Sequence, residues 1–313
     1  MPLVSVIIPA YNEAEVIDRA IESVRTQTLE DFELIVVDDC SDDETADIAS
    51  SYDDPRMEVV RHSNNRGGGA ARNTGIMNAE GRYLAFLDAD DEWYEQKLEV
   101  QHEHLSSMDD SHVGVYCAAY NTNNRGPIAS AVYERVFDTS TPPDEGGSEL
   151  IPYVLSKEFG VGSSTLFIKA DTVQKMGGFD SEFDRHQDVE FLIRLLKTGK
   201  LAYVDEELMI KHHTGTPSPD TVRDAKAELF EKFQEEIRSA QQEGFPVVEN
   251  HRLSLARYYA RAGRGGDALR AFRTVPDRTL HDYVLFSVSL TIDRLRGDIQ
   301  TGASTRQRPA DRQ

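Results

Sequence analysis

Along the first hundred residues, short unbroken apolar runs alternate with stretches in which apolar residues recur every three or four positions. The run at 4–8 is interrupted only by a serine and ends at Pro9, which is typical of a buried strand. Apolar spacing at 13–27 predicts a helix. A second apolar run at 32–37 then ends in two aspartates. Strand, helix and strand in this order predict a βαβ unit with parallel strands.

The same alternation continues to residue 211. We expect further strands at 57–60, 83–87, 113–119, 163–168 and 208–211, and helices at 41–52, 69–79, 98–108 and 188–197. Ser41 and Glu44 have the spacing of a capping box at the start of the first of these helices. Residues 121–148 are rich in Asn, Gly, Pro and Thr and predict a loop. Alternating strands and helices build an open α/β sheet that binds ligands at the carboxyl ends of its strands.

After residue 221 the pattern becomes helical. Residues 225–237 carry one amphipathic stripe, and residues 255–272 predict a helical hairpin around a glycine-rich turn. Another apolar helix is expected at 284–292. The polar end of the chain is expected to be disordered. We therefore expect an α/β domain, a helical region and a disordered tail at 1–218, 219–298 and 299–313.

The charge of the chain narrows the class of protein. The formal net charge is −21, with 22 Lys and Arg against 49 Asp and Glu in residues 1–250, and 12 Arg against six Asp in residues 251–313. Such an acidic body argues against a nucleic-acid partner. Acidic excess with few lysines resembles proteins of salt-loving organisms such as halophilic archaea, in which salt screens self-repulsion. The basic C-terminal tract predicts either a solvated arginine-rich face or peripheral contact with anionic lipid.

Two features point to the cytoplasm. Cys40 and Cys117 have no metal-site spacing, and we expect both to be reduced thiols. The chain begins almost directly with a strand, without a cleavable signal, and no window approaches the roughly 18–20 apolar residues of a membrane span. We expect a cytoplasmic protein that does not cross the membrane.

The segment 83–91 carries the most chemical information. Its apolar run ends in Asp88, Asp90 and Asp91. Clustered carboxylates repel one another, so a folded protein keeps them together only with a cation or with hydrogen-bond donors. Carboxylates on alternate residues suit a hard divalent ion such as Mg²⁺ or Mn²⁺. A calcium-binding EF-hand loop is disfavoured because its sixth position, where that loop requires glycine, is Trp93.

Other polar residues follow strand ends that should share this edge of the sheet. Tyr11 offers an aromatic ring beside a base-sized slot, and Asp39 can accept from a base N–H. Each feature also has a structural interpretation. Asp38 and Asp39 can be helix-capping residues, glycines 67–69 can form either a phosphate-binding loop or a plain turn, and Asp188 can be a helix N-terminal charge.

Four motifs, in this order, resemble those of the family 2 glycosyltransferases with the GT-A fold. They are VSVIIPAYNE at 4–13, VVDDCSDDET at 36–45, NRGGGAARNTG at 65–75 and FLDADD at 86–91. Each motif alone is weak evidence, whereas four at this spacing are strong, and the resemblance covers residues 3–215. It implies a Rossmann-like mixed sheet flanked by helices. It also implies inverting transfer from a nucleoside-diphosphate sugar, most often a UDP-sugar.

The resemblance also implies roles for single residues in donor binding. Pro9, Tyr11 and Glu13 fall in the nucleotide site, where Tyr11 packs on the base. Asp39 is assigned to the uracil ring and Arg72 to the polar edge of the nucleotide.

The remaining implied roles concern the metal and the acceptor. Asp88 is assigned to ribose and metal, and Asp90 to direct coordination of Mg²⁺ or Mn²⁺. Asp188 is the expected catalytic base, although it follows Gln187 where the family more often has Glu, and Glu190 is the fallback. The family often carries a histidine near the metal or diphosphate. His212 and His213 both match this family histidine, and His213 is taken as the metal ligand.

The expected acceptor is a glycan or lipid-linked glycan, in protein N-glycosylation or surface-polysaccharide synthesis. A sugar nucleotidyltransferase is an alternative. It would carry a basic, glycine-rich signature after the first strand, where this chain has Ala-Tyr-Asn-Glu at 10–13. A non-catalytic scaffold that binds nucleotide sugars is a second alternative, although Asp90 together with Asp188 favours an enzyme.

Overall fold

The structure is a computed structural model that describes residues 1–122, 143–157, 159, 161–183, 185–212, 217–276, 283 and 286. Most of the loop expected at 121–148, nearly all of the helix expected at 284–292, the tail at 299–313 and His213 lie outside the described residues. The chain divides into two compact units, residues 1–215 and residues 216–313. Each unit is described by itself.

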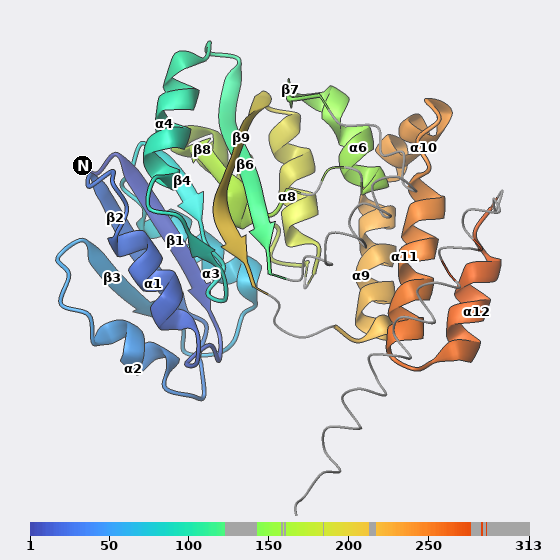
Figure 1. Ribbon diagram of the computed structural model, residues 1–313, viewed down its shortest axis with the longest axis horizontal. Coiled ribbons are helices and arrows are strands. Elements are labelled where there is room, and N and C mark those ends of the chain that lie inside the picture. The colour runs from blue at the N-terminus through green and yellow to red at the C-terminus, as the bar shows by residue number, and fades with distance from the viewer. Residues whose placement is uncertain are drawn as a thin grey trace, which may run out of the picture. The chain divides into compact units, whose positions relative to one another are not determined.

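The first unit is built on one mixed sheet (Figure 1). Its described strands are β1 Val4–Ala10, β2 Phe32–Asp38, β3 Met57–Arg61, β4 Tyr83–Phe86, β5 Glu92–Trp93, β6 His112–Asn121, β7 Glu145–Gly146, β8 Leu166–Lys169 and β9 Lys200–Lys211. They follow the order β3-β2-β1-β4-β8-β6-β9-β5, and β7 pairs with β9. The pairs β1–β2, β1–β4 and β2–β3 are parallel, whereas β8 is antiparallel to β4 and β6. The predicted mixed α/β sheet is confirmed.

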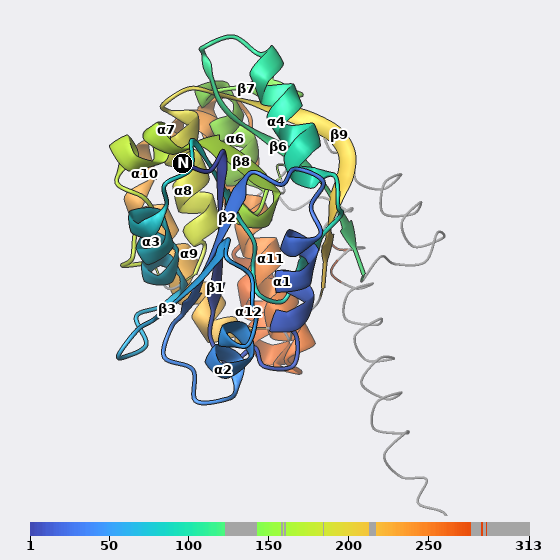
Figure 2. The ribbon, with the colours of Figure 1, turned by 90° about the vertical axis from the view of Figure 1, so that its left-hand side faces the viewer.

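Helices cover both faces of this sheet. They are α1 Ile17–Arg25, α2 Thr45–Ser50, α3 Gly68–Asn78, α4 Lys97–Ser107, α6 Ile151–Ser156, α7 Ala170–Met176 and α8 Gln187–Leu196, with 3₁₀ turns η1 Ser148–Leu150 and η2 Ser163–Thr165. Apolar residues of α1 and α4 pack with Val4, Val6 and Ile8 of β1 in one core cluster. Helix α3 lies on the other face, where a Cβ on Gly75 would come 2.4 Å from Ile7 Cγ2 (Figure 2). Glycine at this position lets the helix approach the sheet closely.

Some local predictions are wrong. Ser41 does not cap α2, because that helix begins at Thr45 after Glu44, and the Ser41 hydroxyl instead accepts from the Asn12 backbone N–H at 2.9 Å. The expected strand at 163–168 begins with the 3₁₀ turn η2, and β9 begins eight residues before the expected strand at 208–211. Helices α6 and α7 were not predicted.

The second unit is helical in its described part. Its helices are α9 Pro219–Lys232, α10 Gln234–Gln242, α11 Val247–Arg261 and α12 Gly265–Arg273. The amphipathic stripe at 225–237 extends over two helices, α9 and α10, which meet at Phe233. The hairpin of α11 and α12 is confirmed, with Tyr259 and Phe272 in its core and Gly263 at φ +71° in its turn. Among the described helices, none is long and apolar enough to span a membrane.

Candidate active site

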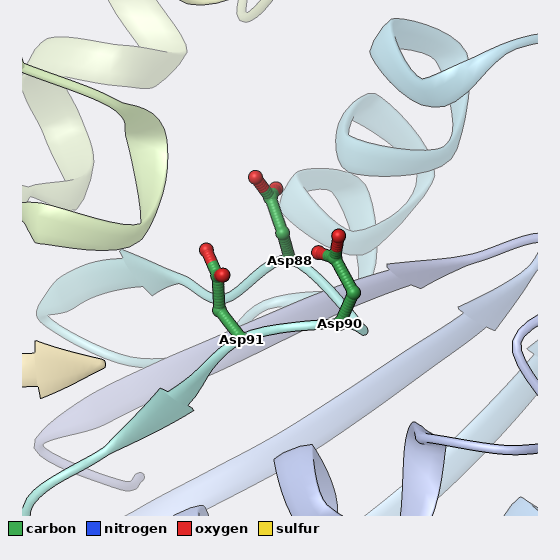
Figure 3. A group of neighbouring side chains, drawn as sticks. All are labelled: Asp88, Asp90 and Asp91. Carbon is green, nitrogen blue, oxygen red and sulfur yellow. The ribbon is translucent and has the colours of Figure 1, made fainter. Parts of the chain in front are cut away.

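Three carboxylates gather where β4 ends. Asp88, Asp90 and Asp91 each offer an oxygen, and these oxygens all lie within 4.8 Å of one another. A tight turn brings them together, in which the Asp91 backbone N–H donates to the Asp88 carbonyl at 3.0 Å. Figure 3 shows the three side chains projecting to the same side of this turn. The arrangement concentrates negative charge at the carboxyl end of a central strand.

Asp88 is held as an anion by neighbouring cations. Arg72 Nη2 on α3 donates to Asp88 Oδ1 at 2.5 Å, and the Asp88 backbone N–H donates to Ser164 Oγ at 3.1 Å. Burial acts to raise the pKa of Asp88, but the positive charges of Arg72 and Lys211 outweigh it and hold that pKa below its usual value. Asp88 is therefore charged at neutral pH.

Asp91 is the most buried of the three, with 1% of its surface exposed. Its Oδ1 accepts from the His212 backbone N–H at 3.1 Å, while Oδ2 has no hydrogen-bond partner among the described residues. Burial raises the pKa of Asp91 to about 7, with Lys211 opposing the shift and the other two carboxylates adding to it. A buried acceptor oxygen of this kind is able to bind a cation or accept a hydrogen bond. The sequence pointed to the aspartate cluster but gave this member no role.

Lys211, the last residue of β9, was missed by sequence reasoning. Burial acts to lower the pKa of its ammonium group, but the carboxylates of Asp88, Asp91, Asp188 and Asp90 raise it above its usual value. This lysine therefore places a permanent positive charge opposite the aspartates. Its position at the end of a strand, directly before two histidines, is the signal that was available in the sequence.

Asp188 lies in the first turn of α8 and reaches the same site. Burial raises the pKa of its carboxyl group, the charge of Arg72 opposes that shift, and Asp88 adds to it. The preceding residue, Gln187, accepts through Oε1 from Arg72 Nη1 at 3.0 Å. Arg72 thus bridges the strand-end aspartates and the start of α8. The sequence prediction placed Asp188 near Asp88, and the structure brings the two together.

The start of α8 is positioned by α3. Asn73 Nδ2 donates to the Phe179 carbonyl at 2.8 Å, and its Oδ1 accepts from the Phe179 N–H at 2.7 Å. Phe179 in turn lies 5.3 Å from the Arg72 guanidinium. Gly178 has φ +72°, and a Cβ there would come 2.3 Å from Asn73 Oδ1, so the turn requires glycine. The two hydrogen bonds between Asn73 and Phe179 fix this turn, which precedes Asp188 in the chain.

Two other expected site residues lie differently. Glu190 is fully buried and accepts from Arg194 Nη2 and Nε, both at 2.6 Å, so its two oxygens serve a structural ion pair. His212 directs its ring toward Glu92, with Nε2 3.7 Å from Glu92 Oε1. Glu190 is therefore engaged with Arg194 within α8, whereas Asp188 lies near Arg72 and Asp88.

Asp39 follows β2 and is 2% exposed. Its oxygens accept from the backbone N–H groups of Arg66 and Gly67 and from the ring of His62. Sequence reasoning did not identify His62. Asp39 is thus tied into the loop that precedes α3 rather than standing free at the strand end.

One cavity of about 200 Å³ lies between the carboxyl ends of β1, β2 and β4 and the first turns of α3. Its walls include the residues expected to bind the nucleotide, namely Pro9, Tyr11, Glu13, Asp39, Arg72 and Asp88, together with Asp90. Tyr11 is 44% exposed. Burial raises the pKa of Glu13, and the nearby Asp90 charge adds to that shift.

Comparison with known proteins agrees with this geometry. Residues 5–148 match the sequence profile of glycosyl transferase family 2. The chain is 34% identical over 210 residues to the uncharacterized glycosyltransferase RP339 of Rickettsia prowazekii, covering 67% of this chain and 63% of that protein. It is 37% identical over 126 residues to the UDP-Glc:alpha-D-GlcNAc-diphosphoundecaprenol beta-1,3-glucosyltransferase WfgD of Escherichia coli, covering 40% and 49% of the two chains.

A solved structure supports the architecture. The mannosyltransferase PcManGT of Pyrobaculum calidifontis, solved with GDP-Man and Mn²⁺, superimposes with a TM-score of 0.61 at 17% identity, covering 96% of this chain and 84% of that one. The protein has the GT-A fold. Through residues 5–148 it carries a glycosyl transferase family 2 domain, and it spans 63% of the length of its relative RP339.

Proposed function

We propose that this protein is an inverting glycosyltransferase that moves a sugar from a nucleoside-diphosphate sugar, specifically a UDP-sugar, to an acceptor hydroxyl. The observation that carries the proposal is the convergence of Asp88, Asp90, Arg72, Lys211 and Asp188 on one site from four separate parts of the chain. Carboxylates for a metal, cations for phosphates and a separate carboxylate for a proton are the groups that this transfer needs.

The aspartate cluster fits a divalent metal ion. Its donors are all oxygens, which Mg²⁺ and Mn²⁺ prefer, and Asp91 Oδ2 is a buried acceptor without a partner among the described residues. Asp90 and Asp88 would hold the ion, with Asp91 beside them and His213 as a further ligand on the family resemblance. When bound, the ion would neutralise charge that develops on the departing diphosphate.

The cavity beside this cluster suits the nucleotide. We assign the ring of Tyr11 to packing on the base, Asp39 to a base N–H, and Pro9 and Glu13 to the surrounding wall. Arg72, which pairs with Asp88, faces the polar edge of the nucleotide. Lys211 adds positive charge near the position of the diphosphate.

Asp188 is assigned as the general base. Its raised pKa makes it a better proton acceptor than an exposed aspartate, and Arg72 beside it limits that rise. Asp188 takes the proton of the acceptor hydroxyl as the hydroxyl oxygen forms its bond to the anomeric carbon. The bond from that carbon to the diphosphate breaks in the same step, which inverts the configuration and releases UDP.

The acceptor is proposed to be a lipid-linked glycan, in surface-polysaccharide synthesis or protein N-glycosylation. Similarity to WfgD, whose name gives a diphosphoundecaprenol-linked acceptor, supports a lipid carrier. The arginine-rich residues 251–313 support peripheral contact with anionic lipid at the cytoplasmic face. The acidic composition of residues 1–250 supports work in concentrated salt, as in a halophile.

A donor screen tests the reaction. Purified protein is incubated in high salt with Mn²⁺ or Mg²⁺, single nucleotide sugars and a lipid-linked acceptor. Release of UDP from one UDP-sugar is expected, and Asp90→Ala and Asp188→Asn should both lower its rate by about 100-fold or more. Release of pyrophosphate would instead identify a nucleotidyltransferase. Binding without any turnover would identify a scaffold.

Vesicle flotation tests the location. The protein should float with vesicles that contain anionic lipid at low salt and should be released as salt rises. Neutral vesicles are the control. Failure to bind anionic vesicles at any salt concentration would remove the membrane part of the proposal and leave the transfer reaction untouched.

A further inference from the structure

A buried chain of hydrogen bonds lies behind Asp39. His62, directly after β3, has Nδ1 2.6 Å from Asp39 Oδ1 and Nε2 2.8 Å from Thr74 Oγ1 on α3. All three residues are at most 8% exposed. The His62 backbone N–H also donates to the Asp38 carbonyl at 2.9 Å, so both the ring and its backbone are held in place.

The partners of His62 define its tautomer. An ionised carboxylate only accepts hydrogen bonds, so the Asp39 side requires the proton on Nδ1. In the neutral ring Nε2 is then the acceptor, and the Thr74 hydroxyl donates to it. The hydrogen bonds therefore all donate in one direction, from the Thr74 hydroxyl through the imidazole to the carboxylate. They fix the plane of the Asp39 carboxylate.

Protein donors use most of the acceptor capacity of Asp39. Oδ1 accepts from His62 and from the Arg66 N–H at 2.9 Å, and that same N–H lies 3.1 Å from Oδ2. Oδ2 also accepts from the Gly67 N–H at 2.7 Å. A carboxylate offers about four lone-pair positions, and three donors occupy three of them. One acceptor position is left on a residue that lines the cavity.

We propose that His62 is a positioning residue that limits Asp39 to one hydrogen bond from the nucleotide base and thereby selects uracil over guanine. Uracil presents a single N3–H donor on its pairing edge. Guanine presents two adjacent donors, at N1 and at the exocyclic N2, and here the second would find no free acceptor. The inference rests on the proposed nucleotide-sugar function and deepens it.

The glycine loop supports this selection. Gly67 has φ +85°, a conformation that other residues adopt only with strain, and it presents its N–H to Asp39. Two of the three donors are thus backbone groups that no side-chain substitution removes directly. Among the described residues, His62 is the one side chain that donates to Asp39 Oδ1, so a substitution at His62 can alter the proposed base selection.

Calorimetric binding of UDP and GDP to the full chain tests the proposal. The native protein should bind UDP at least about tenfold more tightly than GDP, because one unpaired donor is worth about that factor. In His62→Ala, UDP affinity should fall about tenfold and the UDP/GDP ratio should approach one. His62→Asn, which keeps an amide donor near the Nδ1 position, should restore most of the preference.

Steady-state kinetics distinguish a role of His62 in positioning Asp39 from a general loss of enzyme structure. His62→Ala should raise the KM for the UDP-sugar about tenfold and leave kcat at saturating donor within about twofold. His104→Ala, on α4, is the matched control and should change neither parameter. Thr74→Val removes only the hydroxyl that orients the ring, so it serves as the second variant if His62→Ala fails to fold, and it should narrow the UDP/GDP ratio about threefold.

The outcomes are distinct. An unchanged UDP/GDP ratio in folded His62→Ala, or in Thr74→Val if the first variant does not fold, overturns the proposal. A native protein that binds UDP and GDP equally overturns it too, while the proposed transfer reaction stands. A native protein that binds neither UDP nor any UDP-sugar overturns both.

Discussion

The pKa values of neighbouring carboxylates at the candidate site are shifted in opposite directions. Burial raises the pKa of Asp188 and Asp91, whereas Arg72 and Lys211 hold the pKa of Asp88 low despite its burial. Such a separation lets one carboxylate stay anionic, as a metal ligand must, while another can accept a proton. At the scale of single residues, Arg72 sets this division because it pairs directly with Asp88 and lies close to Asp188.

The substitution Asp188→Asn tests the proposed base. An amide cannot accept the acceptor proton, and removal of a general base typically lowers turnover by about 10²–10⁴-fold. UDP binding should change by less than about threefold, since Asp188 is assigned to the acceptor side. Steady-state rates and calorimetry measure the two effects.

Asp171→Asn is the matched control for that substitution, because Asp171 is also in the first turn of a helix but is exposed. It should leave turnover unchanged. Near-native turnover in Asp188→Asn, with the donor site intact, would show that another group takes the proton.

Lys211→Met should act in opposite directions on two ligands. Removing a positive charge from beside four carboxylates should strengthen binding of Mn²⁺ alone by severalfold and weaken binding of UDP by about tenfold. Titration calorimetry with each ligand separately measures both. Lys200→Met, at the other end of β9, is the control and should alter neither affinity. Parallel weakening of both ligands would contradict the proposed placement of Lys211.

At the scale of elements, the 3₁₀ turn η2 connects the aspartates to a buried polar network. The Trp93 indole N–H donates to the Ser164 carbonyl at 3.0 Å, and Gln101 Nε2 on α4 donates to the Thr165 carbonyl at 2.8 Å. Lys97 donates to Gln101 Oε1 at 2.5 Å and lies 4.0 Å from the centroid of the Trp93 ring. This network holds the turn whose Ser164 hydroxyl accepts from the Asp88 backbone.

The burial of Lys97 predicts a pH-dependent stability. Burial lowers its pKa from 10.5 to about 8, so between these values the unfolded chain binds more protons than the folded one. The contribution of Lys97 to stability is therefore lowest below pH 8 and grows as pH rises toward 10.5. Relative to Lys97→Met, the native protein should gain about 2 kcal/mol between pH 7 and pH 10.

Urea unfolding of both proteins at several pH values measures this difference. Between pH 6 and pH 7 the gap between them should stay constant, because Lys97 is protonated in both states, which provides an internal control. A gap that stays constant up to pH 10 would mean that Lys97 has an ordinary pKa in the folded protein.

The elements that could be predicted from the sequence are those whose local pattern of apolar residues is sufficient to define them. Strands β1, β2 and β4 are short apolar runs that end at polar residues, and α8 has a clear apolar face. The apolar pattern of β9 is interrupted in its middle, because Asp205, Glu206 and Glu207 are exposed, and the strand continues across them through its pairing with β6. The capping box failed because the hydroxyl of Ser41 is used by Asn12, a contact across 29 residues.

The same division holds for the site. Asp88, Asp90 and Asp188 belong to motifs with a fixed local pattern, so sequence alone could propose them. Lys211 and His62 belong to no motif, and their importance arises from contacts between residues far apart in the chain. The roles of the motif residues stay predictions until variants are measured.

At the scale of the whole molecule, charge is unevenly distributed along the chain. Residues 1–250 carry 27 more acidic than basic side chains, whereas residues 251–313 carry six more basic than acidic ones. Repulsion among so many like charges opposes the folded state, and salt reduces it by shortening the screening length from about 10 Å at 0.1 M to about 3 Å at 1 M. The native protein should therefore be stabilised by salt.

Thermal unfolding followed by calorimetry measures this expectation. At pH 8, raising NaCl from 0.1 M to 1 M should raise the Tm of the main transition by roughly 4–8 °C, which corresponds to about 2 kcal/mol for a unit of this size. Near pH 5, close to the sequence isoelectric point of about 4.8, net repulsion nearly vanishes and the salt effect should largely disappear. The scan at pH 5 thus separates screening from ion-specific effects. A Tm that is flat or falls with salt at pH 8 would show that self-repulsion does not limit the stability of this acidic chain.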